Sequence, residues 1–331
     1  LLAVVEMTVI MKKSEIRKDY LFDKYVIISP GRALRPREFN EKKKEPIGKS
    51  PFTPDQIKSS VIIDAIGRGD KRVVAIPNIF PVVTPNNAKA YGRHEVIIET
   101  PKPNVPLSDL SLEQIENVLA MYVRRTRALM KDPKIAYVLC LKNEGVNSGA
   151  SIRHAHSQIL ALGLLPPDLI EEAKRAAEYK KIKGSDFYSD VIKMEMKSPR
   201  RIFDNEYFAV FSPYASAYHY EAWIFSKRPA DNISRLSKKE LSSLAVILKR
   251  ILKKLDDLGI SYNYFCHQVI SDRRQHFCIK IQPRDSVWGG LELGSGLVVN
   301  SIPPEEAAKE YRKLFQKSKK IANIKRFFSI L

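Results

Sequence analysis

The sequence predicts an α+β fold in which two similar halves build an antiparallel sheet with helices packed on one face. A first observation is a repeat: Glu95 and Glu221 each open a strand-like run, and they stand 126 residues apart. Leu-Ser pairs ending at Ser111 and Ser237 follow at the same separation, which indicates an internal duplication. A second observation is that the strand-like runs are joined by short hairpin-like connections, which favour antiparallel pairing.

Each half reads strand, strand, helix, strand, strand. Ser111 and Ser237 are helix N-cap candidates, because a hydroxyl accepts a hydrogen bond from a first-turn N–H, and acidic or amide residues follow both. Apolar residues then recur at helical spacing, which predicts helices over Leu112–Met130 and Lys238–Leu258. The strands predicted after these helices are Ala136–Leu141 and Ser157–Leu162 in the first half, and Tyr262–Ile270 and His276–Gln282 in the second.

The same pattern divides the chain into four parts. They are an N-terminal extension (1–18), a first half (19–165), a connecting helix (166–184) and a second half (185–331). Pro166-Pro167 predicts that the connecting helix begins near Asp168 and runs to Lys183. Pro303-Pro304 and two following glutamates predict a basic amphipathic helix over Pro304–Phe328. We expect no signal peptide, because the apolar N-terminus lacks a basic leader.

Composition excludes several classes of protein. Hydrophobic residues make up 44% of the 331 residues, enough to bury a sizeable core, so general disorder is excluded. No apolar stretch is long enough for a membrane-spanning helix. Lysine and arginine exceed aspartate and glutamate by 56 to 37, a net charge of +19 that favours anionic partners such as nucleotides or phosphate esters. The basic residues lie in separate runs, so we do not expect nucleic acid as the partner.

Three cysteines are present, Cys140, Cys266 and Cys278, and none forms a Cys-x-x-Cys pair. This excludes a cysteine zinc site and a disulfide framework. We expect three buried free thiols in a reducing cytoplasm. The alternative, that Cys266 faces Cys278 across a hairpin, stays open from the sequence.

The residues with the clearest chemistry are His154, His156 and Gln158, whose spacing of two puts them on one face of a strand. Gly149 precedes them and lets the backbone approach a ligand, and Ser151 with the loop N–H groups can bind phosphate oxygens. A neutral imidazole can attack phosphorus if one ring nitrogen is free and a carbonyl holds the proton on the other. The alternatives are two structural histidines or two metal ligands.

This motif resembles the His-x-His-x-Gln signature of the galactose-1-phosphate uridylyltransferase branch of the histidine triad superfamily. The resemblance covers roughly Asp19–Lys313 and rests on several ordered segments: Tyr25–Pro36, Ile76–Pro81, Glu95–Pro101, Lys142–Gly145, Trp288–Gly294 and Pro304–Ala308. The fold that it implies, two tandem histidine-triad-like repeats, agrees with the duplication seen independently.

The resemblance implies a ping-pong uridylyltransferase. His156 would attack the α-phosphorus of UDP-glucose to form a uridylyl-histidine, supported by the backbone carbonyl of His154 and by Gln158 and Ser151 on the phosphoryl oxygens. Glucose 1-phosphate would leave, and galactose 1-phosphate would take the UMP. The implied substrate-binding residues are Arg32, Arg35, Asn78, Asn143, Gly149, Ala150, Glu292 and Asn300, with the two arginines on phosphate, Asn78 on the nucleoside and Glu292 on the sugar.

The resemblance also implies that metal sites are lost. Ser50 and Thr53 stand where many members carry two zinc-binding cysteines, and Pro103 falls at a later ligand position, leaving only His154. One imidazole does not hold zinc, so we predict no metal and no cofactor. His267 and His276 resemble remnants of a second metal site, but Cys278 and Lys280 break its pattern.

Several alternatives remain open from the sequence. ADP- or UDP-sugar phosphorylases and diadenosine tetraphosphate phosphorylases share the motif and differ in base and acceptor, and a non-catalytic nucleotide- or RNA-binding protein is a further possibility. The resemblance implies a homodimer. The second half is expected to lack the nucleophile, with Cys278 in its place. His94 and His219 are expected to be structural or exposed and to lie outside the site.

Overall fold

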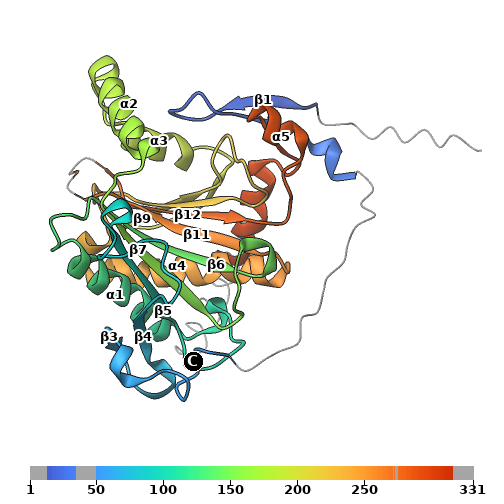
Figure 1. Ribbon diagram of the computed structural model, residues 1–331. Helices are drawn as coiled ribbons and strands as arrows, with labels where there is room; N and C mark the ends of the chain where they lie inside the picture. Colours follow the sequence, from blue (N-terminus) through green and yellow to red (C-terminus); the bar gives the residue numbers. More distant parts are fainter. Residues whose placement is uncertain (1–12, 35–49, 271, 273–274, 316–331) are drawn as a thin grey trace, which may run out of the picture.

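A ten-stranded antiparallel sheet forms the centre of the computed structural model, which describes residues 13–34, 50–270, 272 and 275–315 (Figure 1). Its strands, in spatial order, are β3 (Asp64–Ile66), β4 (Val73–Pro77), β5 (Gly92–Ile98), β7 (His156–Leu162), β6 (Tyr137–Glu144), β11 (Tyr262–His267), β12 (Cys278–Pro283), β10 (Ala222–Ser226), β9 (Phe208–Phe211) and β8 (Arg201–Asp204). The strands predicted at β6, β7, β11 and β12 are confirmed, with ends that differ by a few residues.

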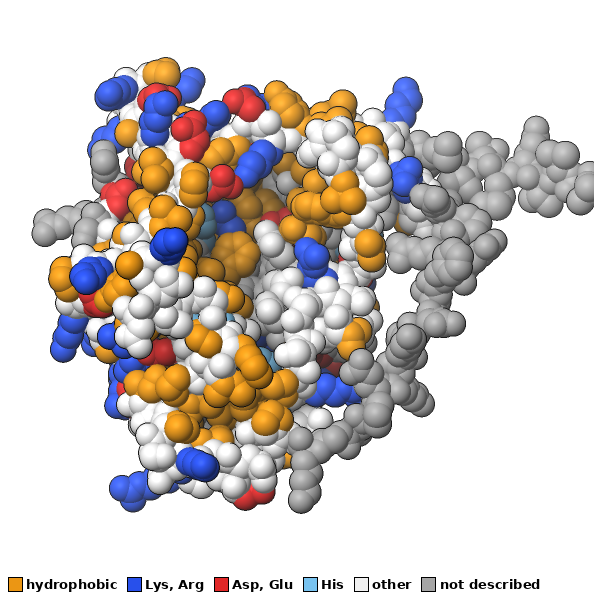
Figure 2. Space-filling model, in the orientation of Figure 1, with side chains coloured by type: hydrophobic (Ala, Val, Ile, Leu, Met, Phe, Trp, Pro, Cys, Tyr) orange, Lys and Arg blue, Asp and Glu red, His pale blue; other side chains and the backbone are white. Residues whose placement is uncertain are grey.

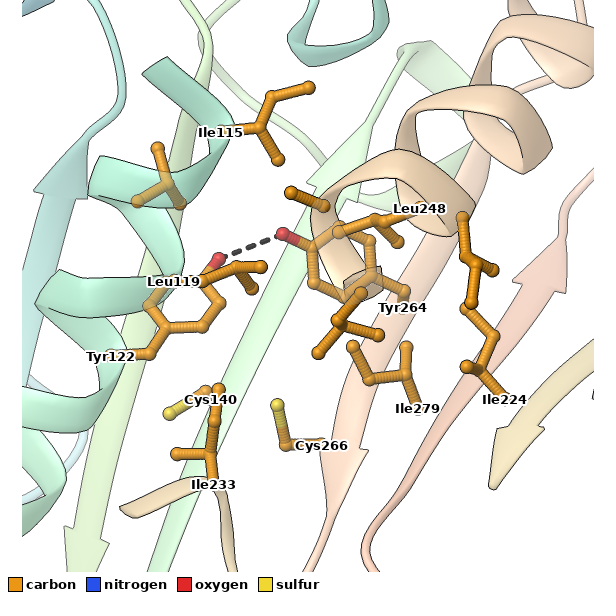
Figure 3. Packing of buried hydrophobic residues seen from close by; sticks show 14 of the residues in the cluster. Ile115, Leu119, Tyr122, Cys140, Ile224, Ile233, Leu248, Tyr264, Cys266 and Ile279 are labelled. Carbon is orange, nitrogen blue, oxygen red and sulfur yellow. Dashed lines mark hydrogen bonds between the residues drawn. The ribbon is translucent and has the colours of Figure 1, made fainter. Parts of the chain in front are cut away.

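The two halves of the sheet have the same strand order when each is followed from its outer edge to the middle. Strands β3-β4-β5-β7-β6 meet β11-β12-β10-β9-β8, so each strand of the first half has a counterpart in the second. The halves join where β6 pairs with β11, with Leu141 opposite Phe265. Continuing this register by one residue sets Cys140 beside Cys266, and Figure 3 shows the two sulfurs in the core. The duplication is therefore confirmed, and these cysteines lie at its centre.

Two long helices cover one face of the sheet. They are α1 (Leu112–Leu129) and α4 (Lys238–Asp257), close to the predicted ranges. The Ser111 hydroxyl accepts a hydrogen bond from the Gln114 N–H, and the Ser237 hydroxyl accepts one from the Glu240 N–H. In α4 the Glu240 carboxylate also accepts from the Ser237 N–H, which completes a capping box. The sequence therefore marked both helix starts correctly.

The opposite face carries a helix that the sequence did not predict. Helix α3 (Phe187–Met196) follows the connecting helix α2 (Pro167–Lys183) and packs against β9. Phe187, Val191 and Ile192 of α3 contact a cluster that includes Phe211 and Phe225. The remaining elements are α5 (Gly290–Ser295), a helical segment at 304–315, and the short 3-10 helices η1 (Pro30–Leu34), η2 (Ser59–Val61), η3 (Gly69–Lys71), η4 (Ala88–Ala90), η5 (Leu107–Asp109), η6 (Val146–Ser148) and η7 (Ile233–Arg235).

Equivalent positions of the two halves are 126 residues apart at the helix caps, but not on strands β5 and β10. Glu95 lies on the helix face of β5 and forms an ion pair with Arg125 of α1. On β10, Ala222 and Ile224 contact the helix-side core, so Glu221 points to the other face. Ile159 and Ile279 occupy equivalent positions, and they pair with Glu95 and Ile224 respectively. Equating Glu95 with Glu221 was therefore wrong by three positions, and an odd shift in a strand exchanges its two faces.

Helices α1 and α4 pack together over a core shared by both halves (Figure 3). Ile115 and Leu119 of α1 and Leu248 of α4 are among its fully buried residues. Within this core the hydroxyls of Tyr122 and Tyr264 lie 2.8 Å apart, one from each half. Since both rings are fully buried, this hydrogen bond satisfies two polar groups and links the halves.

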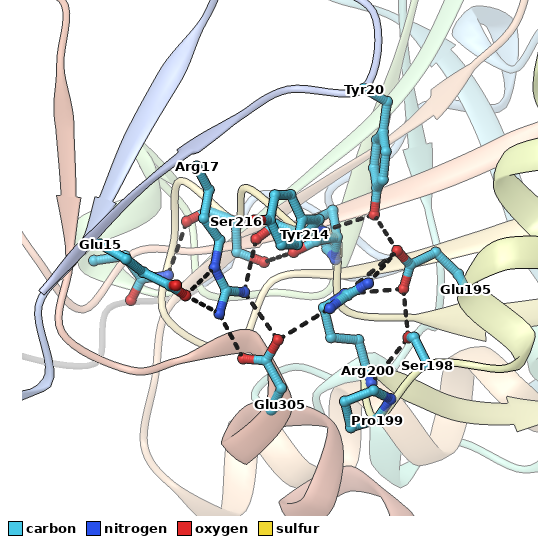
Figure 4. Close-up of polar contacts among 12 residues, drawn as sticks. Glu15, Arg17, Tyr20, Glu195, Ser198, Pro199, Arg200, Tyr214, Ser216 and Glu305 are labelled. Atoms are coloured by element: carbon cyan, nitrogen blue, oxygen red, sulfur yellow. Dashed lines mark hydrogen bonds and ion pairs between the residues drawn. The ribbon is translucent and has the colours of Figure 1, made fainter. Parts of the chain in front are cut away.

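A small separate sheet, β1 (Glu15–Lys18), β2 (Tyr25–Ile28) and β13 (Val298–Asn300), joins the two ends of the described chain. Ion pairs connect this small sheet to the rest of the molecule (Figure 4). Arg17 of β1 forms an ion pair with Glu305, and Arg200 forms ion pairs with both Glu305 and Glu195. Of the predicted extension 1–18, residues 1–12 lie outside the described residues and the remainder contains β1. The predicted C-terminal helix is described only to residue 315.

All three cysteines are buried and free, as expected. Cys266 and Cys278 lie on neighbouring strands but contribute to cores on opposite faces, so they do not pair. Among the described residues no helix is both long and apolar enough to cross a membrane.

Candidate active site

Strand β7 presents His156 and Gln158 to a cavity on the face of the sheet opposite α1. Ile159 and Ala161 face the helix-side core, so alternation turns His156 and Gln158 to the other side. The cavity has a volume of about 610 Å³, and Figure 2 shows hydrophobic side chains gathered on the lower half of this face. It is lined by Pro51, Phe52, Gln56, Ile57, Lys58, Val61, Ile76, Pro77, Asn78, Ile79, Phe80, His94, Val96, Ser151, Ile152, His156 and Gln158.

The imidazole of His156 is held in one orientation and one tautomer. Its Nδ1 lies 2.8 Å from the carbonyl oxygen of His154, so Nδ1 carries the hydrogen and donates it. Nε2 is then left with a free lone pair, and no hydrogen bond to it is seen among the described residues. The Phe52 ring packs against the imidazole at 5.2 Å between centroids. Burial lowers the pKa of His156 below its ordinary value, so the ring is neutral near pH 7.

His154 supports the site through its backbone, while both nitrogens of its ring are used elsewhere. Nε2 donates to the carbonyl of Thr100 at 2.6 Å, and Nδ1 accepts from the Ser50 hydroxyl at 2.8 Å. The side chain is 1% exposed and is therefore closed to substrate. The predicted support by the His154 carbonyl matches this geometry.

The neighbourhood of His154 does not fit zinc. Ser50, where the resemblance implies a zinc-binding cysteine in many members, offers a hydroxyl that is already bonded to the imidazole. Hydroxyls and one histidine do not make the set of thiolates and imidazoles that zinc prefers. Within the described parts of the chain, no three or more histidine, cysteine, aspartate or glutamate side chains form a group that could hold a metal ion.

A buried charge cluster lies directly beneath His156, on the helix side of the sheet. The Lys142 ammonium donates to the carbonyl of His156 at 3.0 Å and to the Glu99 carboxylate at 2.7 Å, and forms an ion pair with Glu144. The Lys142 and Glu99 side chains are fully buried. This cation fixes the backbone at the start of β7, and its charge adds to the lowering of the His156 pKa.

His94 is a cavity residue that the sequence interpretation placed outside the site. Its Nε2 lies 2.7 Å from Oε1 of Gln158 and 3.1 Å from Nδ2 of Asn78. No motif in the sequence signals it, because only the pairing of β5 with β7 brings His94 to Gln158. His219, by contrast, binds Asp285 and lines no part of this cavity, as expected.

The loop before β7 forms a second, adjoining cavity of about 400 Å³. Ser151 and Ile152 line both cavities, and Ala150 lines the second. Gly149 has φ +83°, and a Cβ there would meet no atom within 4 Å. The glycine is therefore required by its left-handed backbone, and the space beside it is open to a ligand.

Asn143 lies on the cavity side of β6, beside the nucleophile's strand. Its Oδ1 accepts a hydrogen bond from Asn263 at 2.7 Å, which leaves its NH₂ group to donate elsewhere. Asn78 is fixed in the same manner, since its Oδ1 accepts from the Phe80 N–H at 2.8 Å. The NH₂ group of Asn78 lies 3.1 Å from Nε2 of His94.

Five of the predicted substrate residues line neither cavity: Arg32, Asn143, Gly149, Glu292 and Asn300. Arg32 in η1 lies close enough to Glu292 of α5 for its charge to act on that carboxylate. The Glu292 carboxylate accepts from the Gly289 N–H. Asn300 is fully buried, and its NH₂ group donates to backbone carbonyls, which gives it a structural role in this chain. Arg35 lies outside the described residues.

The apolar wall of the cavity includes Ile79 and Phe80, from the segment Ile76–Pro81 that resembles the family's nucleoside-contacting strand, and Ile57 and Val61, which were not singled out from the sequence. Ile79 and Phe80 are exposed to 81% and 82%. Large exposed apolar side chains around a few polar groups are typical of a ligand-binding site. Lys58 adds a cation to this wall.

In the second half, the residues at the positions equivalent to His156 and Gln158 are buried. Ile159 pairs with Cys140, and Ile279 pairs with Cys266, so Cys278 is the counterpart of Gln158 and His276 that of His156. Placing Cys278 at the nucleophile position was therefore wrong by two residues. His276 is fully buried with Nδ1 bonded to the Ser226 carbonyl, and the His267 ring is bonded to Glu172.

Comparison with known proteins agrees with this geometry. The sequence model described as "Galactose-1-phosphate uridyl transferase, N-terminal domain" matches residues 84–166, and the corresponding C-terminal domain model matches residues 172–269. The chain is 28% identical to ADP-glucose phosphorylase of Arabidopsis thaliana over 340 residues, 91% of this chain and 93% of that protein. It is 28% identical to galactose-1-phosphate uridylyltransferase of Thermotoga maritima over 67% of this chain and 74% of that protein.

Solved structures give the same result. An ADP-glucose phosphorylase from Arabidopsis thaliana with bound ADP-glucose superposes with a TM-score of 0.80 at 27% identity, covering 91% of this chain and 98% of that chain. A uridylyltransferase superposes with a TM-score of 0.72 at 28% identity, covering 92% and 99%. The two family models together span more than half of the sequence, including the catalytic motif. The chain belongs to the galactose-1-phosphate uridyl transferase family.

Proposed function

We propose that this protein transfers a nucleotidyl group from a nucleoside diphosphate sugar to a phosphate-bearing acceptor through a covalent intermediate on His156. The observation that carries the proposal is the hydrogen bond from Nδ1 of His156 to the His154 carbonyl. It leaves a neutral imidazole with Nε2 directed to a cavity that has an apolar wall and amide donors. This combination suits a nucleotide and an in-line attack on its α-phosphorus.

In the first half-reaction the lone pair of His156 Nε2 forms a bond to the α-phosphorus. The bond between that phosphorus and the oxygen bridging to the β-phosphate breaks, and sugar 1-phosphate leaves with that oxygen. Gln158 and Ser151 line the cavity beside Nε2 and are placed to donate to the phosphoryl oxygens. In the second half-reaction an acceptor phosphate oxygen attacks the phosphorus, and the phosphorus–nitrogen bond breaks.

The finer assignment has two candidates. The first follows from the motif resemblance: UMP passes from UDP-glucose to galactose 1-phosphate, and UDP-galactose is released. Similarity to galactose-1-phosphate uridylyltransferases of several organisms supports it.

The second candidate is an ADP-sugar phosphorylase, in which inorganic phosphate accepts AMP and ADP is released. It is favoured by similarity to ADP-glucose phosphorylase over almost the whole length of both chains, in sequence and in fold. Among the described residues, the apolar cavity wall is formed by Ile57, Val61, Ile79 and Phe80 and offers no contact that selects uracil or adenine. An experiment is therefore needed to distinguish the two candidates.

The mass of the intact protein after brief incubation with UDP-glucose or ADP-glucose tests both. We expect a gain of one nucleoside monophosphate in the wild type and none in His156→Ala, because the adduct forms on that ring. Discharge of the adduct by galactose 1-phosphate supports the first candidate, and discharge by inorganic phosphate supports the second. His219→Ala is the matched control, since His219 binds Asp285 outside the cavity. Absence of an adduct with both donors would favour a binding protein without catalysis.

The proposal includes a homodimer and a cytoplasmic location. Arg32 and Glu292, implied in substrate binding, line neither cavity of their own chain, so a second copy could present them to the site. The three free, buried thiols suit a reducing compartment. Light scattering should give a mass about twice the 37.8 kDa of one chain. A mass of one chain that is independent of concentration would contradict the dimer.

A further inference from the structure

His94 connects two amide side chains in the wall of the proposed nucleotide cavity. Its Nε2 is 2.7 Å from Oε1 of Gln158 and 3.1 Å from Nδ2 of Asn78. The side chain is 8% exposed, and it reaches the cavity from β5, the strand paired with β7. His94 therefore touches both a residue proposed to bind phosphoryl oxygens and one proposed to bind the nucleoside.

The hydrogen on this imidazole has a defined position. The backbone N–H of Val82 donates to Nδ1 at 3.4 Å, so Nδ1 carries a lone pair. Burial lowers the pKa of His94, which keeps the ring neutral near pH 7. The single hydrogen is then on Nε2, where the closest acceptor is Oε1 of Gln158.

This donor decides which end of the Gln158 amide faces the cavity. A glutamine amide can present either its oxygen or its NH₂ group, and the two are nearly equal in shape. With Oε1 bonded to His94, the NH₂ group is the end left for a ligand. An NH₂ group donates to phosphoryl oxygens, whereas an amide oxygen in its place would repel them.

The Asn78 amide is not a competing partner for the same nitrogen. Its Oδ1 is committed to the Phe80 N–H, so its free end is an NH₂ group, which cannot accept the Nε2 hydrogen. With the hydrogen on Nε2, the 3.1 Å contact between Nε2 and the Asn78 NH₂ nitrogen is not a hydrogen bond. His94 therefore orients only the Gln158 amide.

We propose that His94 is a positioning residue for nucleotidyl transfer: it holds the Gln158 amide with its NH₂ group toward the phosphoryl oxygens. The inference rests on the proposed function and deepens it. His94 makes no bond to the reacting phosphorus and transfers no proton; it acts only through Gln158. This predicts that the effect of removing His94 depends on the presence of Gln158.

A double-mutant cycle tests this dependence. The single-turnover rate of adduct formation is measured with UDP-glucose and with ADP-glucose, using whichever loads the wild type. We expect His94→Phe, which keeps an aromatic ring but removes the donor, to slow loading by roughly 5- to 10-fold, the value of one positioned hydrogen bond. His94→Gln, which can still donate, should restore most of the rate. In the Gln158→Ala background, His94→Phe should cause no further loss.

His219→Phe is the matched control, and it should load at the wild-type rate because His219 bonds Asp285 and Ser301 away from the cavity. Thermal unfolding of every variant separates loss of fold from loss of rate, and His94→Leu replaces His94→Phe if the latter does not fold.

Two results would overturn the role of His94 while the proposed function stands: equal losses from His94→Phe with and without Gln158, or a His94→Gln variant as slow as His94→Phe. A wild type that loads with neither donor would instead overturn the proposed function, and the inference with it.

Discussion

At the scale of single residues, the chemistry of the site depends on where three imidazoles carry their hydrogens. His156 donates from Nδ1 to a backbone carbonyl, and His154 donates from Nε2 to another. The proposed nucleophile is therefore His156, whose Nε2 is free, although both rings belong to one motif. His94 donates from Nε2 to Gln158, so each histidine has a different task set by the acceptor it faces.

The pH dependence of loading follows from the state of His156. Burial lowers the pKa of this ring below about 6.5, the value of a free imidazole, and the neutral form is the nucleophile. The rate should therefore be level above neutral pH and fall only as the pH drops below about 6.5. A pH series of single-turnover loading measures this. Gln158→Ala should keep the same acid limb at a lower rate, and a limb above pH 7 would contradict a buried neutral nucleophile.

At the scale of elements, strands and helices depend on different features of the sequence. A strand alternates its faces, so a single shift in register would turn His156 and Gln158 into the helix-side core. The helices instead depend on their ends. Both α1 and α4 begin at a serine whose hydroxyl accepts a backbone N–H, and α4 adds the reciprocal bond from Glu240.

Removing the α4 cap should lower stability without touching the site. Ser237→Ala removes the acceptor for the Glu240 N–H, and we expect the free energy of unfolding to fall by about 1 kcal/mol. Denaturant unfolding measures the change. Ser242→Ala, within the same helix, is the control and should be neutral or slightly stabilising because alanine is the better helix former. An equal loss in both variants would show that the cap bond contributes nothing specific.

At the scale of the whole molecule, the two halves share one sheet and one core, so they are expected to unfold together. Strands β6 and β11 pair in the middle, and α1 packs against α4 across the same junction. The buried hydrogen bond between Tyr122 and Tyr264 joins the halves at their centre. The cavity beside His156 belongs to the first half, while α3 and its aromatic cluster pack on the equivalent face of the second half.

The tyrosine pair offers a test of this junction. Tyr122→Phe leaves the Tyr264 hydroxyl buried without this partner, which should cost about 1–3 kcal/mol of unfolding free energy. The double variant with Tyr264→Phe should lose clearly less than the sum of the single variants, because it removes both polar groups. Denaturant unfolding of the four proteins gives the coupling. Additive losses would mean that the hydroxyls do not depend on one another.

The sequence by itself determined the features that depend on local order. The caps at Ser111 and Ser237, the helices that follow them and the single face shared by His156 and Gln158 are consequences of side-chain spacing along the chain. The motif resemblance also indicated the family correctly, because the family's segments occur in order along most of the chain.

Only the tertiary structure decided what strand pairing and packing bring together. His94 and Gln158 stand 64 positions apart and meet because β5 pairs with β7. The chain likewise does not reveal that Arg32, Glu292 and Asn300 lie away from His156, nor that α3 covers the second half. Spacing along one strand fixes which face a residue occupies, but the neighbour across the sheet depends on register and strand order, which arise from the packing of the whole core.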